Sequence, residues 1–523
     1  GQHYLLGTIC IYLLLILIFL EKLIQEFKIR YVAGLGISVA ASIIYSYYNT
    51  YMALAFAAIY CILRLLNPNL GMNVKERIKR GCCILGSVIC GVLTGAVTLL
   101  PAASYLTTSS SRLDSDASAL AKFFGGLFSS YTMAQNAETT GRLVSNNLYY
   151  INDYSCIDGW NNYYEMPNVC FTIFIYFFLG QLLVQSIKRC KDVKKIWYGV
   201  LIAIVGILLI FNPGVAIAFN GFAYAQPRYT FVLMPIAALL VAVEWDRIMI
   251  KKEFSFTGLL LGLVASMYVV IEAYNRASDE VKKYDAVILT LFVAFAIILL
   301  AVGLWKNRQV QKVAGSLFLV CILLSTCLES YITNNNRWTA YTWTEAIGYD
   351  GHTMTNDTID ALQYLKEQDK DFFRVDKGYA AVSTYGDSQV MGYSSVTDYN
   401  STINRHLADF YNMLYTKVKV SDAQRIFEYS DESEVYPMGL INLKYILSMG
   451  ELDYSWCEYV GRTGGVYIYR NKYADSAASF YTNTISKSEC ESMDETGRRL
   501  LLKDTLIVPD GEDVLHDLSL IHI

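Results

Sequence analysis

Charged residues are scarce in this 523-residue chain, since Asp, Glu, Lys and Arg together make up only 17% of it. Hydrophobic residues make up 54%, and the mean hydropathy is +0.31. Soluble domains carry about 25% charged residues, so these values exclude an ordinary water-soluble protein and indicate an integral membrane protein. The net charge of −4 combines two chemically different regions and says nothing about partners. Because the chain has no basic patch interleaved with aromatic residues, we expect no nucleic-acid partner.

Histidine is also scarce, and none of the five histidines lies in an apolar run. The chain contains no CxxC pair and no Cys/His spacing typical of metal ligands, which argues against a disulfide or zinc framework. Most of the twelve cysteines lie in apolar runs, where a thiol behaves as a small hydrophobe. We expect Cys156, Cys457 and Cys490 to be exposed to an outer aqueous phase. No cofactor is indicated, although a divalent metal remains open.

Motifs for nucleotide or hydrolase chemistry are missing as well. The sequence contains no Walker A, GxSxG, HExxH or kinase motif, so cytoplasmic nucleotide chemistry has no support. No helix centre carries a pair of ionisable residues, which makes an ion-coupled transporter less favoured. The first residues, GQHYLLGTIC, include no initiator methionine and no basic segment, so we expect an N-terminally truncated fragment rather than a signal peptide.

Long apolar runs dominate the first two thirds of the chain. A helix needs about 17 to 25 apolar residues to cross the bilayer. Ten runs approach this length, some of them short: 4–20, 31–46, 51–66, 82–100, 168–186, 196–211, 229–245, 255–273, 285–305 and 313–331. The fold class predicted is therefore a polytopic α-helical membrane protein with about ten visible transmembrane helices, over residues 1–331.

Basic residues between these runs predict the orientation. One set of alternate loops holds 19 Lys and Arg in 50 residues, and the other set holds 7 in 100. Because basic loops stay in the cytoplasm, we expect the first set to be cytoplasmic and the long loop 101–167 to lie outside. Long loops tend to be functional, and the apolar middle of this one, AKFFGGLFSSY (121–131), predicts a re-entrant or interfacial segment.

The composition changes after Tyr331, where polar and apolar residues begin to mix. NDTIDALQYLKEQ (356–368) has the spacing of a helix, whereas FFRVD (372–376), LKYILS (443–448) and GVYIYR (465–470) are typical of strands. Residues 332–523 are therefore predicted to form an extracytoplasmic α+β domain, which places the C-terminal domain on the outer side of the membrane.

Polar residues gather in the segment FNGFAYAQPRYTF (219–231), which joins two apolar runs on the predicted outer side. Asn220, Tyr224, Gln226 and Arg228 lie here, and Gly221 allows close approach of a ligand to the backbone. A guanidinium can hold a phosphate with two parallel hydrogen bonds. The alternative is that Arg228 reaches the outer lipid headgroups, as arginines at helix ends often do.

A second set of candidate residues lies in the hairpin SYYNTY (46–51), on the same predicted side. Tyr47, Tyr48 and Asn49 could line the same mouth or belong to an interfacial aromatic belt. Five acids are predicted at this level as well, and each taken singly is more typical of a solvated loop or helix end: Glu272, Glu329, Asp153, Asp158 and Glu165.

Several of these elements, in their order, resemble the bacterial YfhO-type membrane proteins. They are YYNTYM (47–52), TLLP (98–101), NGFAY with Arg228, FFRVD, INLKYILS (441–448) and VYIYRNKYA (466–474). The similarity runs from about residue 31 to residue 475, and it is the order rather than any single element that is specific.

The resemblance implies a GT-C-like glycosyltransferase. Such an enzyme transfers a sugar from a polyprenyl-phosphate carrier to an envelope polymer of the lipoteichoic or teichoic acid type, on the outer membrane face. It also implies a catalytic acid in a first outer loop, which would precede Gly1. Arg228 would then bind the donor phosphate, and Asn220, Gly221, Tyr224, Gln226, Tyr47, Tyr48 and Asn49 would bind substrate. The partners implied are the lipid-linked sugar, the polymer acceptor and membrane lipid.

Two other functions remain open on the sequence alone. A transporter or flippase of lipid-linked envelope precursors would use the same outer cation without chemistry. A non-catalytic envelope assembly factor would use the C-terminal region to bind a partner.

Overall fold

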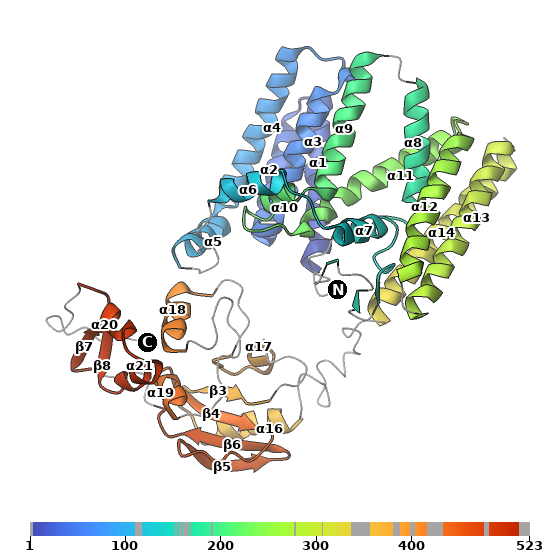
Figure 1. The fold of residues 1–523 in the computed structure, drawn as a ribbon. Coiled ribbons are helices and arrows are strands. Elements are labelled where there is room, and N and C mark those ends of the chain that lie inside the picture. The colour runs from blue at the N-terminus through green and yellow to red at the C-terminus, as the bar shows by residue number, and fades with distance from the viewer. Residues whose placement is uncertain are drawn as a thin grey trace. The chain divides into compact units, whose positions relative to one another are not determined.

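The structure of the chain is a computed structural model, drawn in Figure 1. It describes residues 4–109, 118–151, 154–155, 159–160, 167, 169–189, 192–276, 279–305, 307–335, 356–379, 387–397, 403–415, 432–474 and 481–511. The chain divides into two compact units. The first comprises residues 1–102 and 115–340, and the second comprises residues 103–114 and 341–523.

Helices make up almost all of the described chain up to residue 335. In order they are α1 (Tyr4–Gln25), α2 (Ile29–Tyr45), α3 (Tyr47–Leu66), η1 (Pro68–Leu70), α4 (Val74–Thr94), α5 (Ala96–Thr108), α6 (Ala119–Leu127), α7 (Met133–Arg142), α8 (Ile175–Arg189), α9 (Val193–Phe211), α10 (Pro213–Phe219), η3 (Pro227–Leu233), α11 (Met234–Met249), α12 (Phe256–Arg276), α13 (Asp279–Leu304) and α14 (Arg308–Asn335). Two short strands, β1 (Tyr150–Ile151) and β2 (Tyr154–Ser155), pair between α7 and α8.

Six of these described helices are long and apolar enough to cross a membrane: α1, α3, α9, α12, α13 and α14. A seventh span results if the bent pair α4 and α5 is counted as one. Helices α2 and α8 are apolar but shorter, at 17 and 15 residues. The helical, multi-spanning character predicted from the sequence is confirmed, with six to seven candidate spans in place of the ten expected.

Three of the differences from the predicted runs have a local structural cause. The run 82–100 was expected to end at TLLP, but the helix breaks at Gly95, bends by 74° and continues through Pro101 to Thr108. A Cβ atom at Gly95 would lie 2.8 Å from Ile43 Cγ2, so this close contact with α2 needs a residue without a side chain.

The other two differences concern helix starts. The run predicted from residue 168 becomes helical only at Ile175, after Thr172 Oγ1 accepts a hydrogen bond from the Phe174 backbone N–H at 3.3 Å. The run predicted from residue 229 starts as the 3₁₀ helix η3. Its α-helix, α11, begins at Met234 and carries Pro235 in its first turn, where the missing N–H costs no hydrogen bond.

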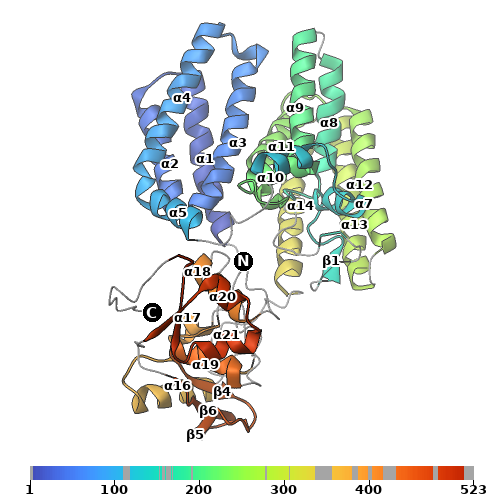
Figure 2. The same cartoon turned by 60° about the vertical axis from the view of Figure 1, so that its left-hand side comes forward.

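Small residues bring the helices of the first unit together. Gly258 and Gly262, four apart on α12, lie against Gly180 of α8, and a Cβ at Gly180 would lie 2.4 Å from the Gly258 carbonyl oxygen. Close backbone approach through residues spaced in this way drives helix association in membranes, where no hydrophobic effect acts between helices. Figure 2 shows α1 to α4 side by side, and α12 beside both α8 and α13.

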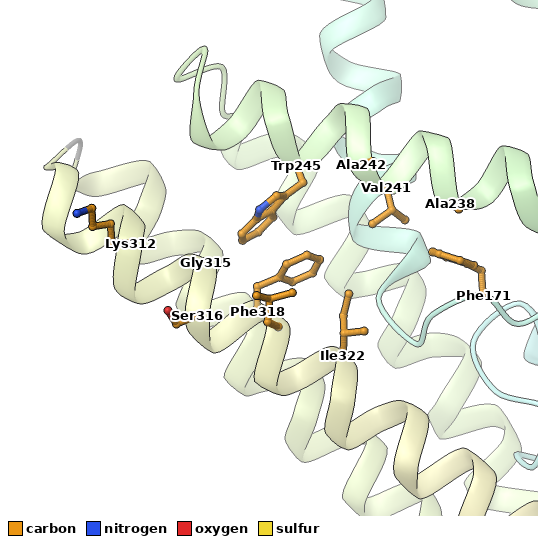
Figure 3. A pocket seen from close by; sticks show the side chains of 11 residues that line it. Phe171, Ala238, Val241, Ala242, Trp245, Lys312, Gly315, Ser316, Phe318 and Ile322 are labelled. Atoms are coloured by element: carbon orange, nitrogen blue, oxygen red, sulfur yellow. The ribbon is translucent and has the colours of Figure 1, made fainter. Parts of the chain in front are cut away.

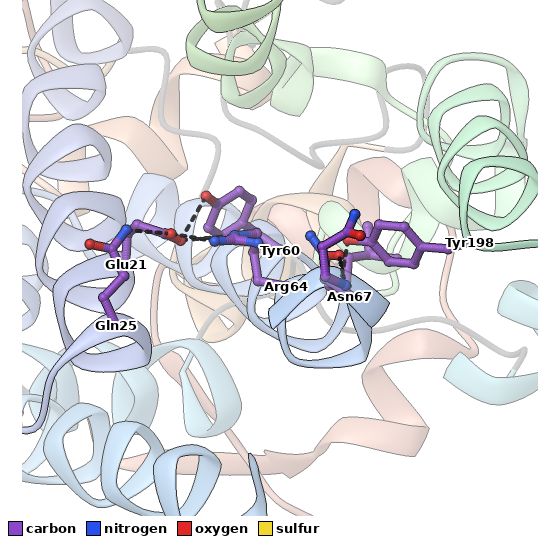
Figure 4. Close-up of polar contacts among 8 residues, drawn as sticks. Glu21, Gln25, Tyr60, Arg64, Asn67 and Tyr198 are labelled. Carbon is purple, nitrogen blue, oxygen red and sulfur yellow. Dashed lines mark hydrogen bonds and ion pairs between the residues drawn. The ribbon is translucent and has the colours of Figure 1, made fainter. Parts of the chain in front are cut away.

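A polar cluster ties α1 to α3 at the end of α3 that is predicted to be cytoplasmic (Figure 4). Glu21 accepts hydrogen bonds from Arg64 Nε at 2.9 Å, from Tyr60 Oη at 3.2 Å and from Gln25 Nε2 at 2.9 Å. Arg64 Nη2 donates a second hydrogen bond to the other carboxylate oxygen, Glu21 Oε1. Tyr198 of α9 donates to the backbone carbonyl of Leu63 at 2.8 Å, so three helices meet here.

The second unit contains the remaining helices and strands. They are α16 (Asn356–Gln368), β3 (Arg374–Lys377), α17 (Asp387–Met391), α18 (Arg405–Leu414), α19 (Glu432–Leu440), β4 (Leu443–Ser448), β5 (Cys457–Thr463), β6 (Val466–Asn471), β7 (Asn483–Ser486), α20 (Lys487–Glu491), α21 (Glu495–Leu501) and β8 (Thr505–Val508). The helix and the three strands expected between 356 and 470 are therefore present, although β5 was not foreseen.

Its main sheet has the strand order β3-β4-β6-β5. Strand β3 runs parallel to β4, and β6 pairs antiparallel with both β4 and β5. Ala361, Leu362 and Leu365 of α16 are buried against this sheet, which explains the helical spacing of apolar residues there.

Two cysteines of this unit differ from expectation. Cys457 and Cys490 were predicted to be exposed, but both are buried. Cys457 opens β5 and belongs to the core around Trp456, and Cys490 lies on α20. A polar sequence context therefore did not mean an exposed thiol, because the short elements carrying these residues turn one face inward. Cys156 lies outside the described residues.

Candidate functional site

The candidate site begins at the first turn of α3. A single residue, Ser46, separates α2 from α3, and the hydroxyls of Ser42 and Thr50 are hydrogen-bonded at 2.6 Å across this hairpin. The hairpin fixes the direction of the side chains that follow it. The hydroxyls of Tyr48 and Tyr51 reach the end of α10, where they contact Asn220 and Ala218.

The segment 219–231 turns sharply where it meets α3. Helix α10 ends at Phe219, and the next residues include Gly221 with φ of +64° and Phe222 with φ of +63°. Positive φ is easy for glycine but uncommon for phenylalanine, and such residues gather at functional sites. The sharp turn lets the chain reverse and continue into η3 at Pro227.

A hydrogen-bonded cluster joins the two segments through Asn220. The Tyr48 hydroxyl donates to Asn220 Oδ1 at 2.7 Å, and the Asn220 side-chain nitrogen donates to the Tyr224 carbonyl at 3.0 Å and to Gln226 Oε1 at 3.5 Å. The Tyr51 hydroxyl donates to the Ala218 carbonyl at 2.7 Å. The structure therefore brings the side chains of Tyr48, Asn220 and Gln226 together with the backbone carbonyl of Tyr224, and their binding of a substrate stays a prediction.

Burial distinguishes the members of this cluster. Asn220 and Gln226 are each 4% exposed, whereas Tyr224 is 50% exposed. Buried amides normally use their hydrogen-bonding capacity. In the part of the chain that the structure describes, no hydrogen bond is donated by Gln226 Nε2, so this N–H₂ group has capacity left for a ligand.

Three of the predicted residues have other positions in this structure. Asn49 is 5% exposed, and its side-chain nitrogen donates to Ser46 Oγ at 3.1 Å, which stabilises the hairpin itself. Tyr47, the first residue of α3, is 37% exposed. Gly221 is exposed, and a Cβ built there would meet no atom within 4 Å, so its positive φ rather than a close contact explains the glycine.

Arg228 lies on η3, two residues after Gln226, and its side chain is half-buried. The neighbouring Tyr229 anchors this stretch, since its hydroxyl donates to the Leu209 carbonyl at 2.6 Å and its ring stacks on Phe219 at 4.2 Å. Because η3 also packs on α3, the backbone that carries Arg228 is held beside the cluster. A phosphate-binding role for Arg228 stays a prediction.

The long loop covers α10 with its own helix. The apolar stretch 121–131 contains α6, whose Gly126 and Gly214 of α10 lie in close contact, with a Cβ at Gly126 2.9 Å from Gly214 Cα. Asn212 Nδ2 donates to the Leu127 carbonyl at 3.0 Å, and the rings of Phe123 and Phe222 meet edge to face at 5.9 Å. The helical character of this stretch fits the interfacial segment predicted, while its position in a membrane stays a prediction.

Sequence reasoning missed a buried ion pair on α7. Glu138 and Arg142 lie 3.2 Å apart with side chains that are almost fully buried. Glu138 Oε2 also accepts a hydrogen bond from the Trp160 backbone N–H at 2.8 Å, and a Cβ at Gly159 would lie 2.2 Å from the same oxygen. The sequence did contain a signal, namely the i, i+4 spacing of Glu138 and Arg142 behind the capping box of Thr132.

The other acids considered at this level are separate from the cluster. Glu272 pairs with Arg276 on α12 at 2.5 Å, and Glu329 of α14 accepts hydrogen bonds from Asn147 at 2.8 Å and from Tyr284. Among the described residues, no group of three or more His, Cys, Asp or Glu side chains could hold a metal ion. The remaining three candidates, Asp153, Asp158 and Glu165, lie outside the described residues.

The polar side chains brought together where the first turn of α3 meets segment 219–231 are chemically suited to binding rather than to proton transfer. Tyrosine hydroxyls and amides can hydrogen-bond sugar hydroxyls or phosphate oxygens, and aromatic rings can stack on a sugar. A guanidinium on the next turn adds a fixed positive charge. The hydrogen-bonded members, Tyr48, Asn220 and Gln226, contain no carboxylate that would act as a base.

Comparison with known proteins identifies one relationship. A family model described as bacterial membrane protein YfhO matches residues 8–517, which is nearly the whole chain. No curated protein and no solved structure matches the chain.

Proposed function

The chain belongs to the YfhO family of bacterial membrane proteins, and from this premise we propose that it transfers a sugar from a polyprenyl-phosphate carrier to an envelope polymer of the lipoteichoic or teichoic acid type. The reaction would take place on the outer face of the plasma membrane, with the C-terminal unit outside. This proposal agrees with a membrane location, which the family and the apolar helices support.

The observation that carries the proposal is the uncharged cluster of the half-buried Tyr48 with the buried Asn220 and Gln226, next to Arg228 on the adjoining turn. A lipid-linked sugar has its phosphate at headgroup depth and its chain in the bilayer, so it needs a polar site at a helix mouth. The glycosidic bond breaks with negative charge developing on the phosphate leaving group. A fixed guanidinium stabilises that charge in the transition state.

Substitution of Arg228 tests this assignment. We expect Arg228→Ala to lower the rate of sugar transfer about 10²- to 10³-fold, the loss seen when one donor to a developing oxyanion is removed. Arg228→Lys should recover only part of the rate, since it keeps the charge but loses the two parallel hydrogen bonds. The assay uses the full-length protein in liposomes with a radiolabelled polyprenyl-phosphate sugar and an envelope polymer acceptor.

The matched control is Arg276→Ala, which removes an exposed arginine at the end of α12, also on the predicted outer side. Transfer by this variant should equal that of the unchanged protein. Full transfer by Arg228→Ala, with normal membrane insertion, would overturn the role given to Arg228.

A second function has one observation in its favour. Asp285 of α13 is fully buried, and neither of its carboxylate oxygens has a hydrogen-bond partner among the described residues. Buried acids inside membrane helices often mark ion or proton pathways. This would suit a transporter or flippase of lipid-linked precursors. The same liposomes distinguish the two functions, because a flippase moves the labelled lipid between leaflets without transferring its sugar, and Asp285→Asn would then stop the movement.

A further inference from the structure

An apolar groove lies between α11 and α14 (Figure 3), and none of the residues that line it belongs to the candidate site. Helix α11 packs mainly on α8, and α14 packs mainly on α13, so the facing sides of α11 and α14 are not in continuous contact. The rings of Trp245 and Phe318 bridge the two helices, stacked with their centroids 3.9 Å apart. The groove runs along these rings.

The groove has a volume of about 560 Å³ and is lined almost wholly by apolar side chains. Val241, Trp245, Phe318 and Ile322 form much of its wall, and Lys312 lies at one end, as Figure 3 shows. Ligand sites of this size and composition typically enclose an apolar group and hold it with few polar contacts. In a membrane, the apolar group at hand is a lipid chain.

The length of the groove indicates what kind of chain it holds. From Lys312 to Ile322 the helix advances by ten residues, which is about 15 Å at 1.5 Å per residue. The hydrocarbon core of a bilayer is about 30 Å thick, so the groove extends through about one leaflet. This suits a single acyl chain of a phospholipid and is too short for a polyprenyl chain that traverses the bilayer.

The charge at its end indicates the headgroup. Lys312 is exposed, and within the described ranges it takes part in no ion pair, whereas Arg247 at the nearby end of α11 is paired with Glu244. An uncompensated ammonium therefore lies where a phosphate headgroup would be. By the distribution of basic loops, this end faces the cytoplasm, where anionic lipids attract basic side chains.

We propose that this groove is a binding site for an anionic phospholipid, with one acyl chain lying between α11 and α14 and the phosphate held by Lys312. The inference rests on the membrane location and does not depend on the sugar transfer proposed above.

Two substitutions test the two parts of this site. Lys312→Gln removes the charge, and Gly315→Leu places a large side chain in the groove, where Gly315 is part of the lining. Lipid binding to the full chain in detergent is measured by native mass spectrometry with phosphatidylglycerol and, separately, with phosphatidylcholine. Lys312→Gln should weaken phosphatidylglycerol binding about five-fold, which is the contribution of one lysine near a membrane surface, and leave phosphatidylcholine binding unchanged. Gly315→Leu should abolish tight binding of both lipids.

Matched controls separate lipid binding from folding. A Cβ at Gly315 would lie 3.8 Å from Met249 Cε, an ordinary contact, so Gly315→Ala should fold and bind lipid normally. Lys195→Gln removes an exposed lysine at the start of α9, also on the predicted cytoplasmic side, and should bind normally. Unchanged phosphatidylglycerol binding in both test variants would overturn the site. Equal affinity of the unchanged protein for the two lipids, or Lys312-dependent displacement by a polyprenyl phosphate, would overturn the occupant proposed.

Discussion

The two ends of α3 hold polar side chains in opposite ways. At its last turn, Arg64 and Glu21 form an ion pair in which the carboxylate also accepts hydrogen bonds from Tyr60 and Gln25 (Figure 4). At its first turn, Tyr48 donates to Asn220 in a cluster without charge. The charged end is saturated with partners inside the protein, whereas the neutral end keeps an amide N–H₂ at Gln226 that no described residue uses. We infer that the ion pair stabilises the contact between α1 and α3, whereas the neutral cluster retains a donor that a ligand can use.

The largest effect on stability is expected for the ion pair between Glu138 and Arg142 on α7. This pair is buried more deeply than the pair at the end of α3. Arg142→Met would leave the Glu138 carboxylate buried without its guanidinium, and breaking such a pair costs about 3 to 5 kcal/mol of stability. We expect a large fall in the midpoint of thermal unfolding in detergent. Arg276→Met, which breaks the exposed pair with Glu272, should change it little. Similar unfolding midpoints for the two variants would contradict the inference that the buried pair contributes more to stability than the exposed pair.

The pair at the end of α3 should show a smaller effect of the same kind. Arg64→Met removes the main partner of Glu21, each side chain being 24% exposed, and should cost about 1 to 3 kcal/mol of stability. The sugar transfer that we propose should not change per folded molecule, because the substitution lies at the end of α3 opposite to Tyr48. Lys28→Met, which breaks an exposed pair with Glu26, is the control. A loss of sugar transfer without a loss of stability would contradict the purely structural role given to this ion pair.

At the neutral end of α3, a substitution should change sugar transfer more than it changes stability. Tyr48→Phe removes the hydroxyl that donates to Asn220 and should lower stability by only about 1 kcal/mol. Because Asn220 and Gln226 lose their fixed orientation, we expect a fall in the rate of sugar transfer that exceeds the change in stability. The measurement is transfer in liposomes beside thermal unfolding of the same sample. Tyr12→Phe, in α1, is the control for loss of a tyrosine hydroxyl outside this cluster.

A charged pair of the second unit, Asp369 and Lys444, allows the contribution of an ion pair to stability to be followed through its dependence on pH. Burial opposes ionisation of Asp369, but hydrogen bonds from Lys444 and Tyr445 outweigh it and hold the pKa of the carboxyl below its usual value of 3.8. A depressed pKa contributes stability that is complete above pH 3.8 and is lost as the pH falls through the lower value in the folded state. The effect is the smallest of the four, at about 0.5 to 1 kcal/mol.

The pH dependence is measured by acid unfolding of the full chain, followed by tyrosine and tryptophan fluorescence. Below pH 4, down to the lower folded-state pKa of Asp369, the stability of Asp369→Asn should fall less steeply with decreasing pH than that of the unchanged protein. Glu458→Gln, at an exposed position of β5, should show the same dependence on pH as the unchanged protein. An acid transition that is identical in Asp369→Asn and the unchanged protein would remove this pair from the comparison.

Elements with strong periodicity were predictable from the sequence. The bounds of α16 and β4 agree with the segments 356–368 and 443–448, because both show clear spacing of apolar residues and adjoin polar turns. The break at Gly95 and the 3₁₀ start of α11 were not predictable, since hydropathy is continuous across both. Each depends on a contact with another helix or on proline geometry, and an average over an apolar run detects neither.

The sequence by itself determined that the chain is a multi-spanning membrane protein, because apolar length and loop charge depend only on local composition. It also placed residues 47–49 and 220–228 at helix ends on the same predicted side, and left open whether 47–49 line a ligand site or belong to an interfacial aromatic belt. Only the tertiary structure decided which side chains meet. Tyr48 rather than Asn49 reaches Asn220, Glu138 is paired and buried, and α11 and α14 leave a groove between them. These outcomes depend on helix rotation and on packing between distant segments, which no local pattern in the sequence specifies.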